Sequence, residues 1–341
     1  MKFLWVCIFA WGCTCQRDTQ KLAVLKSVDF DEKVIWDVLR EMTQRSHPFG
    51  SEDQRKVADG LVTRLQSDGL VVEERPFSAS TPNPNVKTKD SMSSSPKGGG
   101  PPITVSKSGK NLLAISKEDF EKPCLVAIAS HYDTKHMEGF EYLGANDSAS
   151  SSAALVAIMK SLASFKWNSS ACGILGVWFD GEESVLPKWT DGELNHPAAI
   201  KDHTYGSRQL ASELSQCAPD YCLNVKGHLK SVKAIVLMDM IGSPHLQLSL
   251  DAATDPNLEK KLLQAAEFHQ LTHVIGPRKD LIDDDHVAFR SLGIPSINLI
   301  DFNNLQHWHQ PSDALSEISQ KSIKEAMLLA SSLAFMAASQ P

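Results

Sequence analysis

The sequence has no C-x-x-C spacing, no run of basic residues and no long apolar segment beyond its first dozen residues. A zinc or redox site built on paired cysteines at that spacing is therefore excluded. The net charge of −7 and the isoelectric point near 5.9 argue against a nucleic-acid-binding surface. No stretch is long and apolar enough to cross a membrane, and no internal repeat is evident.

Length and composition are those of an ordinary globular protein. The 341 residues could form one large α/β domain or two modest ones. A hydrophobic content of 42% and a charged content of 22% suit a protein that buries a full core. Twelve histidines are a mild excess, so only those within motifs point to function.

The first fifteen residues have the pattern of an export signal. Lys2 precedes an apolar run that ends at Trp11 and is too short to span a bilayer. Gly12 and Cys13 resemble the end of a bacterial lipoprotein box, although Trp11 is bulkier than that position usually allows. Residues 1–15 are thus either a plain cleaved signal or a lipoprotein signal. Both predict a secreted or periplasmic protein, lipid-anchored through Cys13 in the second case.

Four cysteines remain beyond this signal. Cys217 and Cys222 flank a polar stretch and could form a local disulfide in an oxidising compartment. Cys124 and Cys172 lie at the edges of apolar, strand-like runs, where we expect buried free thiols.

Hydrophobic periodicity predicts helices within residues 29–70 and a strand at 70–78. Residues 79–110 are rich in Ser, Pro, Gly and Lys and are predicted to be a mobile loop inside the domain. Beyond them, strands are predicted at 111–116, 124–130, 173–179, 234–242, 246–252 and 294–300, and helices at 147–165, 205–214, 257–269, 286–293 and 318–337. This alternation predicts a single α/β domain over residues 25–338, with a mixed, mainly parallel central sheet flanked by helices on both faces.

Acidic and histidine residues follow several of the predicted strands. They are His131 and Asp133 in SHYDTK, Asp147 in GANDSAS, Glu182 and Glu183 in FDGEES, and His309 in HWHQPSD. The ends of strands in an α/β sheet are where such sheets build ligand sites. Two carboxylates and one histidine, with one position left open, form the ligand set of a catalytic zinc. The sequence therefore predicts a zinc enzyme.

Each of these residues also has a purely structural interpretation. Asp147 could simply cap the helix that follows it, and the adjacent glutamates could be solvated. Neighbouring glutamates nevertheless suit a division of labour in which one binds metal and the other moves protons. A group that moves protons needs a pKa near the working pH, and close-set carboxylates raise the pKa of a glutamate toward that range. Asp239, Asp284 and Asp285 are candidates for that acidic group, although the run around Asp284 could be a solvated loop or a helix cap.

Taken in order, the motifs SHYDTK, GANDSAS, FDGEE, LMDMIG and WHQPSD resemble those of the M28 superfamily of zinc aminopeptidases. Within it, the sequence is more similar to glutaminyl-peptide cyclotransferases. The features that carry this likeness are HYD followed by Thr-Lys, an FDGEE insert that ends in YGSR, DDH-x-x-F before the last predicted strand, and WH near the end. The motifs run from about residue 120 to residue 320.

The resemblance implies one zinc ion per chain, held by Asp147, Glu183 and His309. It implies that Glu182 is the general acid/base, supported by an acidic hydrogen-bond network of Asp239 and Asp284. Trp308 would line the pocket for the substrate's glutamine side chain. Trp189 is a second candidate pocket residue, one position further from the glutamates than in the family. The implied activity is cyclisation of N-terminal glutamine in peptides or proteins to pyroglutamate, with release of ammonia, by a chain we expect to be a monomer.

The rival interpretation is a zinc aminopeptidase that hydrolyses N-terminal residues. It would bind a second zinc through His131 and Asp239, with Asp147 between the two ions and Glu182 activating water. All of those residues are present, so the inventory of ligands leaves both activities open. The sequence departs from the animal cyclases at Ser130, where they carry a disulfide-forming cysteine.

Overall fold

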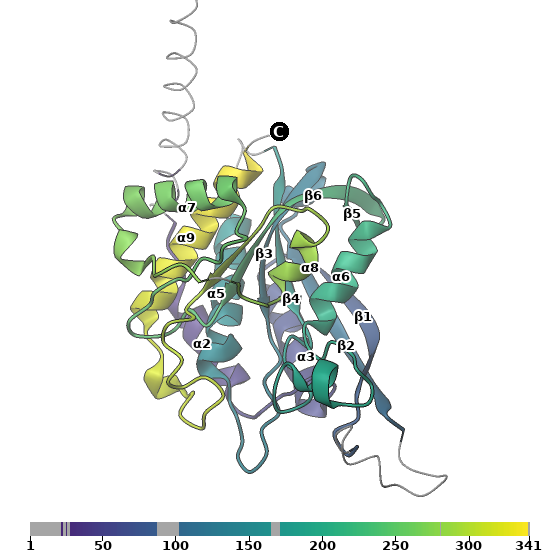
Figure 1. The fold of residues 1–341 in the computed structure, drawn as a ribbon. Helices are drawn as coiled ribbons and strands as arrows, with labels where there is room; N and C mark the ends of the chain where they lie inside the picture. The colour runs from purple at the N-terminus through teal and green to yellow at the C-terminus, as the bar shows by residue number, and fades with distance from the viewer. Residues whose placement is uncertain are drawn as a thin grey trace, which may run out of the picture.

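The computed structural model describes residues 22, 25, 28–86, 102–164, 171–279 and 281–339, and the signal predicted at 1–15 lies outside them. One seven-stranded sheet forms the centre of this part of the chain, with helices packed on both of its faces (Figure 1). The single α/β domain expected from the sequence is thereby confirmed. None of the described helices is long and apolar enough to span a membrane.

The sheet has the strand order β1–β2–β4–β3–β6–β5, and β7 pairs with the second half of β6. Its strands are β1 (Val71–Pro82), β2 (Thr104–Ile115), β3 (Cys124–His131), β4 (Gly173–Phe179), β5 (Cys222–Val225), β6 (His228–Asp239) and β7 (Ser296–Ile300). The central strands β4, β3, β6 and β7 are parallel to one another. The other pairings are antiparallel: β1 with β2, β2 with β4, and β5 with β6. The sheet is therefore mixed, with a parallel centre.

Helices cover both faces of this parallel centre. The helices are α2 (Glu32–Met42), α3 (Glu52–Ser67), α5 (Ser151–Ser164), α6 (Tyr205–Ser215), α7 (Pro256–His269), α8 (His286–Arg290) and α9 (Gln320–Ala338). Helices α2, α5, α7 and α9 pack together on one face, and α6 and α8 pack on the other (Figure 1). Every residue of β3, β4 and β7 is buried as a result, which explains their nearly continuous apolar sequences.

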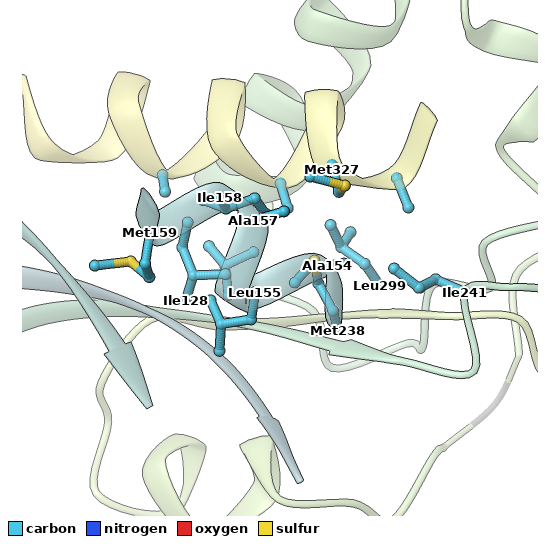
Figure 2. Packing of buried hydrophobic residues seen from close by; sticks show 14 of the residues in the cluster. Ile128, Ala154, Leu155, Ala157, Ile158, Met159, Met238, Ile241, Leu299 and Met327 are labelled. Carbon is cyan, nitrogen blue, oxygen red and sulfur yellow. The ribbon is translucent and has the colours of Figure 1, made fainter. Parts of the chain in front are cut away.

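The larger core lies between the sheet and α9, with α5 in the middle (Figure 2). Leu155 and Ile158 of α5 are fully buried there, close to Ile128 of β3 and Met327 of α9. The first turn of α5 consists of serine and alanine, so this helix can lie close to the sheet. This packing places the N-terminus of α5 at the edge of the sheet where β3 and β4 end.

Two predictions about secondary structure need correction. The segment 79–110, predicted as a loop, contains the paired ends of a long hairpin, because β1 extends to Pro82 and β2 begins at Thr104. Residues 87–101 lie outside the part that the structure describes. The strand predicted at 246–252 is reduced to isolated bridges, because only single residues of it pair with neighbouring segments, such as Leu248 with Ile275 and Ser249 with Ile300.

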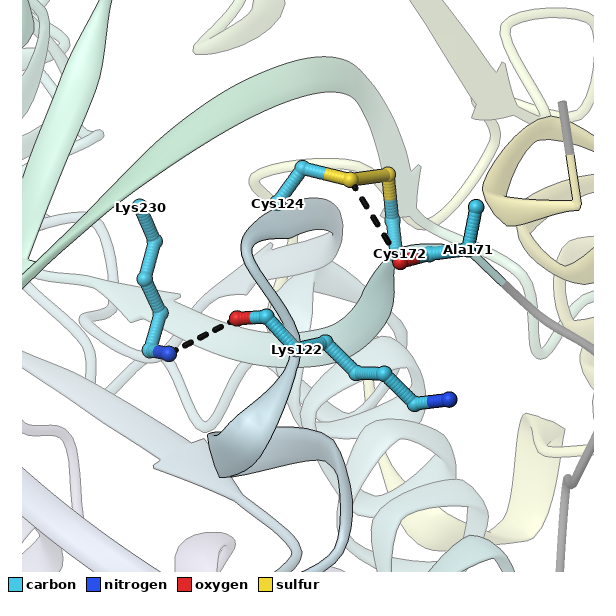
Figure 3. Close-up of a disulfide and its surroundings, with 5 residues drawn as sticks. All are labelled: Lys122, Cys124, Ala171, Cys172 and Lys230. Carbon is cyan, nitrogen blue, oxygen red and sulfur yellow. Dashed lines mark hydrogen bonds between the residues drawn. A yellow bond between two sulfur atoms is a disulfide. The ribbon is translucent and has the colours of Figure 1, made fainter. Parts of the chain in front are cut away.

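The prediction of free thiols at Cys124 and Cys172 is wrong, since the two form a disulfide (Figure 3). Their strands are parallel neighbours in which Leu125 pairs with Gly173, so the residues just before that pair face each other across the ladder. Their Cα atoms lie 4.6 Å apart, well within reach of a disulfide. A one-dimensional pattern cannot reveal this register. Cys217 and Cys222 are also paired, in line with the local disulfide considered above.

Candidate active site

The candidate site lies where the four parallel strands end. β3 ends at His131, β6 ends at Asp239, and Glu182 and Glu183 follow β4 by three and four residues. The segment after β7 brings in His309. Since the carboxyl ends of parallel strands meet at one edge of a sheet, these residues converge although long stretches of sequence separate them.

Asp147 stands between two histidines. Its Oδ1 atom lies 3.1 Å from Nε2 of His131, and its Oδ2 atom lies 3.5 Å from Nε2 of His309. It belongs to an irregular turn (Ala145–Ser150) that precedes α5, and the Tyr142 hydroxyl lies 3.4 Å from Oδ2. Its carboxylate thus faces the centre of the site and not the N–H groups of the helix, so a role confined to helix capping does not describe it.

Two groups of metal-type ligands share Asp147. The first adds Glu183 and His309, with His309 Nε2 3.0 Å from Glu183 Oε1, and the second adds His131 and Asp239, with His131 Nε2 3.3 Å from Asp239 Oδ1. Within each group, the possible ligand atoms lie within 4.8 Å of one another. Both groups have the oxygen and imidazole donors that zinc accepts.

The buried carboxylates give the site an excess of negative charge, which raises the pKa of both histidines. Burial alone would lower the pKa of His309, but the carboxylates of Glu183 and Asp147 raise it to about 10. Burial likewise opposes the charged form of His131, yet Glu182 and other surrounding carboxylates raise its pKa well above the usual range. A bound divalent cation would relieve the same excess of negative charge.

Each group contains a buried carboxylate oxygen that has no hydrogen-bond partner among the described residues, and in the second group this atom is Oδ1 of Asp239. In the first group it is Oε2 of Glu183. A carboxylate oxygen that is buried without a partner is costly in free energy unless a proton or a cation satisfies it. The residues of each group therefore fit a metal ion.

Glu182 is buried beside these ligands. Its Oε2 atom lies 3.9 Å from His131 Nε2, and 4% of the residue is exposed. Burial and the nearby carboxylates, Glu183 first among them, raise the pKa of Glu182 well above its usual range, while His131 opposes that rise. A raised pKa lets a carboxyl group both take up and release a proton near neutral pH.

The run Asp283–Asp285 is not the solvated loop considered as an alternative, because two of its three members are buried. Asp284 accepts a hydrogen bond from the Asn298 amide at 2.6 Å, and burial together with repulsion from Asp239 raises its pKa to about 7. The pKa of Asp239 is raised to about 6, by burial and by Asp147. Asp285 precedes α8 without a side-chain capping bond, so helix capping does not explain it either.

A small pocket opens above these groups. Trp308 stacks on His309 with ring centroids 4.2 Å apart, and Trp189 lies beside His203 at 3.9 Å. The pocket is lined by Asp147, Glu182, Glu183, Trp189, Asp239, Met240, Ile282, Asp283, Asp284, Ile300, Phe302, Trp308 and His309. It therefore holds almost every residue singled out from the sequence. His131 and Asp133 lie beneath it, where Asp133 accepts the backbone N–H groups of both glutamates.

Sequence reasoning missed several buried groups that hold the site together. Asp313, the last residue of the motif that contains His309, accepts the N–H groups of Asn146 and Asp147 and the hydroxyl of Tyr142. Lys135 and Asp202 contact the backbone beyond the glutamates. Asp313 and Lys135 lie within motifs noted above, but nothing in their local sequence distinguishes them from surface residues.

The buried side chain of Ser130 belongs to a small network of hydrogen-bonded hydroxyls. Its hydroxyl lies 2.9 Å from that of Ser151 and 3.3 Å from that of Ser152, both in the first turn of α5. Ser152 in turn donates to the carbonyl oxygen of His131 at 2.6 Å. Buried hydroxyls thus join β3 to α5 directly beneath the site.

Comparison with known proteins places the chain in one family. The model of peptidase family M28 matches residues 111–334. Proteins named glutaminyl-peptide cyclotransferase from Dictyostelium discoideum and Drosophila melanogaster are 26% and 28% identical over 221 and 232 residues. Those matches cover 60% and 61% of this chain and 58% and 59% of the two relatives. The matched region is therefore about three fifths of the length of these curated relatives.

The solved structures with the same fold include proteins named glutaminyl cyclase and proteins named aminopeptidase. A glutaminyl cyclase from an Acidobacteriales bacterium superposes with a TM-score of 0.70 at 24% identity, covering 91% of this chain and 95% of the other. A leucine aminopeptidase precursor from Bacteroides thetaiotaomicron superposes with a TM-score of 0.70 at 19% identity, covering 91% and 98%. At this identity the likeness establishes the fold alone.

Proposed function

This chain belongs to peptidase family M28, and from that premise we propose that it is a zinc-dependent glutaminyl-peptide cyclotransferase. Its substrates would be peptides or proteins with an N-terminal glutamine, and its products pyroglutamate and ammonia. The observation that carries the proposal is the burial of Glu182 in the same pocket as Asp147, Glu183 and His309. The names of the curated relatives favour cyclisation over hydrolysis.

The proposed roles follow from the positions of the side chains. Asp147, Glu183 and His309 would hold one zinc ion, which would supply Lewis-acid polarisation of the γ-carboxamide oxygen. Trp308, and Trp189 across the pocket, would hold the glutamine side chain between apolar surfaces. The nucleophile is part of the substrate, so the pocket mainly has to orient it.

Glu182 would move the proton. In the proposed reaction the substrate's α-amine attacks the amide carbon and closes a five-membered ring. Glu182 accepts the proton that the amine loses and delivers it to the departing ammonia, so it is regenerated in each cycle. Asp239 and Asp284 would support this role, because they line the same pocket and the charge of Asp284 helps to raise the pKa of Glu182.

A second candidate function is a di-zinc aminopeptidase. The observation that favours it is the second ligand group, His131 and Asp239, which shares Asp147 with the first. In that reaction Glu182 would activate a water molecule for attack on the peptide bond. Zinc content separates the two candidates, with one ion expected for the cyclotransferase and two for the peptidase.

We also propose that the protein works outside the cytoplasm, as a monomer. The two disulfides support this location, because disulfides persist in oxidising compartments. The export signal predicted from the first fifteen residues agrees with it. Lipid attachment at Cys13 remains the alternative to free secretion.

Mass spectrometry of two peptides tests the function. Zinc-loaded protein would be incubated with one peptide that begins with Gln and one that begins with Leu. Loss of one ammonia from the Gln peptide, with the Leu peptide unchanged, is the expected result. Release of a free N-terminal residue from either peptide would instead establish the aminopeptidase.

A further inference from the structure

Lys135 is one of the largest side chains that the core buries completely. Its ammonium group donates to the carbonyl oxygen of Ser184 at 2.6 Å and to that of Leu186 at 2.7 Å, and it also contacts the Ser184 hydroxyl. Three acceptors match the three N–H donors of an ammonium group. All three acceptors lie on the segment that follows Glu183 directly, so Lys135 acts on that backbone.

Buried carboxylates hold the same segment through its N–H groups. Asp133 accepts the N–H of Glu182 at 3.0 Å and that of Glu183 at 3.2 Å. Asp202 accepts the N–H groups of residues 185–186 at 3.2 and 2.7 Å. Three buried charged side chains therefore fix the backbone of both glutamates and of the three residues after them.

The position of Lys135 does not follow from ion pairing. In the part of the chain that the structure describes, the hydrogen-bond partners of its ammonium group are uncharged oxygens of Ser184 and Leu186. Burying a charged group is costly in free energy unless hydrogen bonds compensate it. Here backbone carbonyl oxygens of Ser184 and Leu186 compensate the charge. The same hydrogen bonds hold the loop after Glu183 in one conformation.

We propose that Lys135 is a positioning residue for Glu182 and Glu183. By fixing the backbone just beyond them, it sets the glutamate side chains toward the pocket, and Asp133 holds the same backbone from the other side. This inference rests on the function proposed above, in which Glu183 binds the metal and Glu182 moves the proton. Displacing reacting groups by about 1 Å can lower the rate about 100-fold, so a small shift of this loop would lower the reaction rate measurably.

The test replaces Lys135 with methionine, which keeps the length of the side chain and removes its donors. Lys230→Met is the matched control, because Lys230 is also buried and donates to one backbone carbonyl, that of Lys122, at 2.8 Å (Figure 3). Lys230 lies at the start of β6, at the end of the sheet opposite the site. Both variants lose a buried ammonium, but only one contacts the glutamate loop.

Three quantities would be measured for each variant that folds. In metal-free protein, hydrogen–deuterium exchange of residues 182–186 should become faster in Lys135→Met and stay as in the parent in Lys230→Met. Zinc affinity, from competition with a chelator, should fall about 10- to 100-fold in Lys135→Met alone. With a Gln peptide, kcat should fall about 100-fold while KM changes little.

Ser184→Ala provides a second variant in case Lys135→Met does not fold. It removes one acceptor of Lys135 without leaving a charge unpaired, and it should raise exchange of residues 182–186 and lower kcat several-fold. Unchanged exchange and zinc affinity in the variants would overturn the positioning role. If the parent protein binds zinc but does not cyclise peptides, the proposed function fails, while the exchange and affinity measurements still decide the role of Lys135.

Discussion

The Nε2 atom of His309 lies 3.0 Å from the Oε1 atom of Glu183, although 126 positions of sequence separate the two residues. Glu183 reaches this place at the end of β4, and His309 reaches it from the segment after β7. The local sequence marks both residues as candidate ligands but does not show that the two side chains meet. Their proximity makes a carboxylate and an imidazole two parts of one candidate metal site.

Replacing His309 with alanine should remove one of the three proposed metal ligands. We expect zinc affinity to fall at least 100-fold, measured by competition with a chromophoric chelator, because metal binding depends on the number of ligands. His307→Ala is the control, since His307 bonds to the Ser312 hydroxyl at 2.9 Å and makes no contact with Glu183. Equal affinity in the two variants would contradict the assigned ligand set.

Replacing Glu182 with glutamine should separate proton transfer from metal binding. The amide is close in size to the carboxyl group but cannot carry the proton, so kcat should fall about 10²- to 10⁴-fold. Zinc content should stay as in the parent, because Glu182 is not in the first ligand group. Activity close to that of the parent would rule out Glu182 as the acid/base.

The contribution of Asp284 to the stability of the metal-free protein should fall as the pH rises from about 4 to about 7. The pKa of Asp284 is raised from 3.8 to about 7 by burial and by Asp239. Between those values the folded state keeps a proton that the unfolded chain has released, so raising the pH favours unfolding. Asp284→Asn should therefore be more stable than the parent at pH 8, and this advantage should shrink at pH 5.

Urea unfolding at the two pH values measures this effect. Asp283→Asn is the control, because the Asp283 side chain is half exposed and pairs with Lys201 at the surface. Its stability relative to the parent should change little between pH 5 and pH 8. A stability difference for Asp284→Asn that does not depend on pH would show that the group titrates normally.

The Cys124–Cys172 disulfide should contribute more stability than the Cys217–Cys222 disulfide. The first bridges 48 positions of sequence and the second bridges 5, and a longer closed loop restricts the unfolded chain more. Replacing the first pair with alanine should cost about 2–4 kcal/mol. Denaturant midpoints of the two double variants, compared under oxidising conditions, would show the order, and a reversed order would contradict the argument.

Trp308 should affect substrate binding more than the chemical step. Its ring stacks on His309 and lines the pocket, so Trp308→Leu removes aromatic surface while leaving an apolar wall. The expected result with a Gln peptide is a KM about 2- to 10-fold higher, the range of an aromatic contact, with a smaller change in kcat. The same substitution at Trp189, which lines the pocket and also packs against His203, should raise KM as well.

Part of the site could be predicted from local sequence, and part could not. The apolar runs of β3, β4 and β7, each followed by acidic or histidine residues, were enough to indicate a ligand site at one edge of a parallel sheet. The buried members of the Asp283–Asp285 run could not be told from the exposed one, because all three are the same residue in the same short segment. From the sequence alone, Lys135 would also be predicted to lie at the surface, because lysine is rarely buried.

The sequence by itself determined the alternation of strands and helices and the chemical identity of the candidate ligands, because both depend on residue type and short-range spacing. Tertiary structure alone decided what depends on register and on distant contacts. It paired Cys124 with Cys172, extended the β1–β2 hairpin into a segment with loop composition, and made Asp147 common to two ligand groups. The physical reason is that packing brings together groups whose separation along the chain leaves no trace in their local sequence.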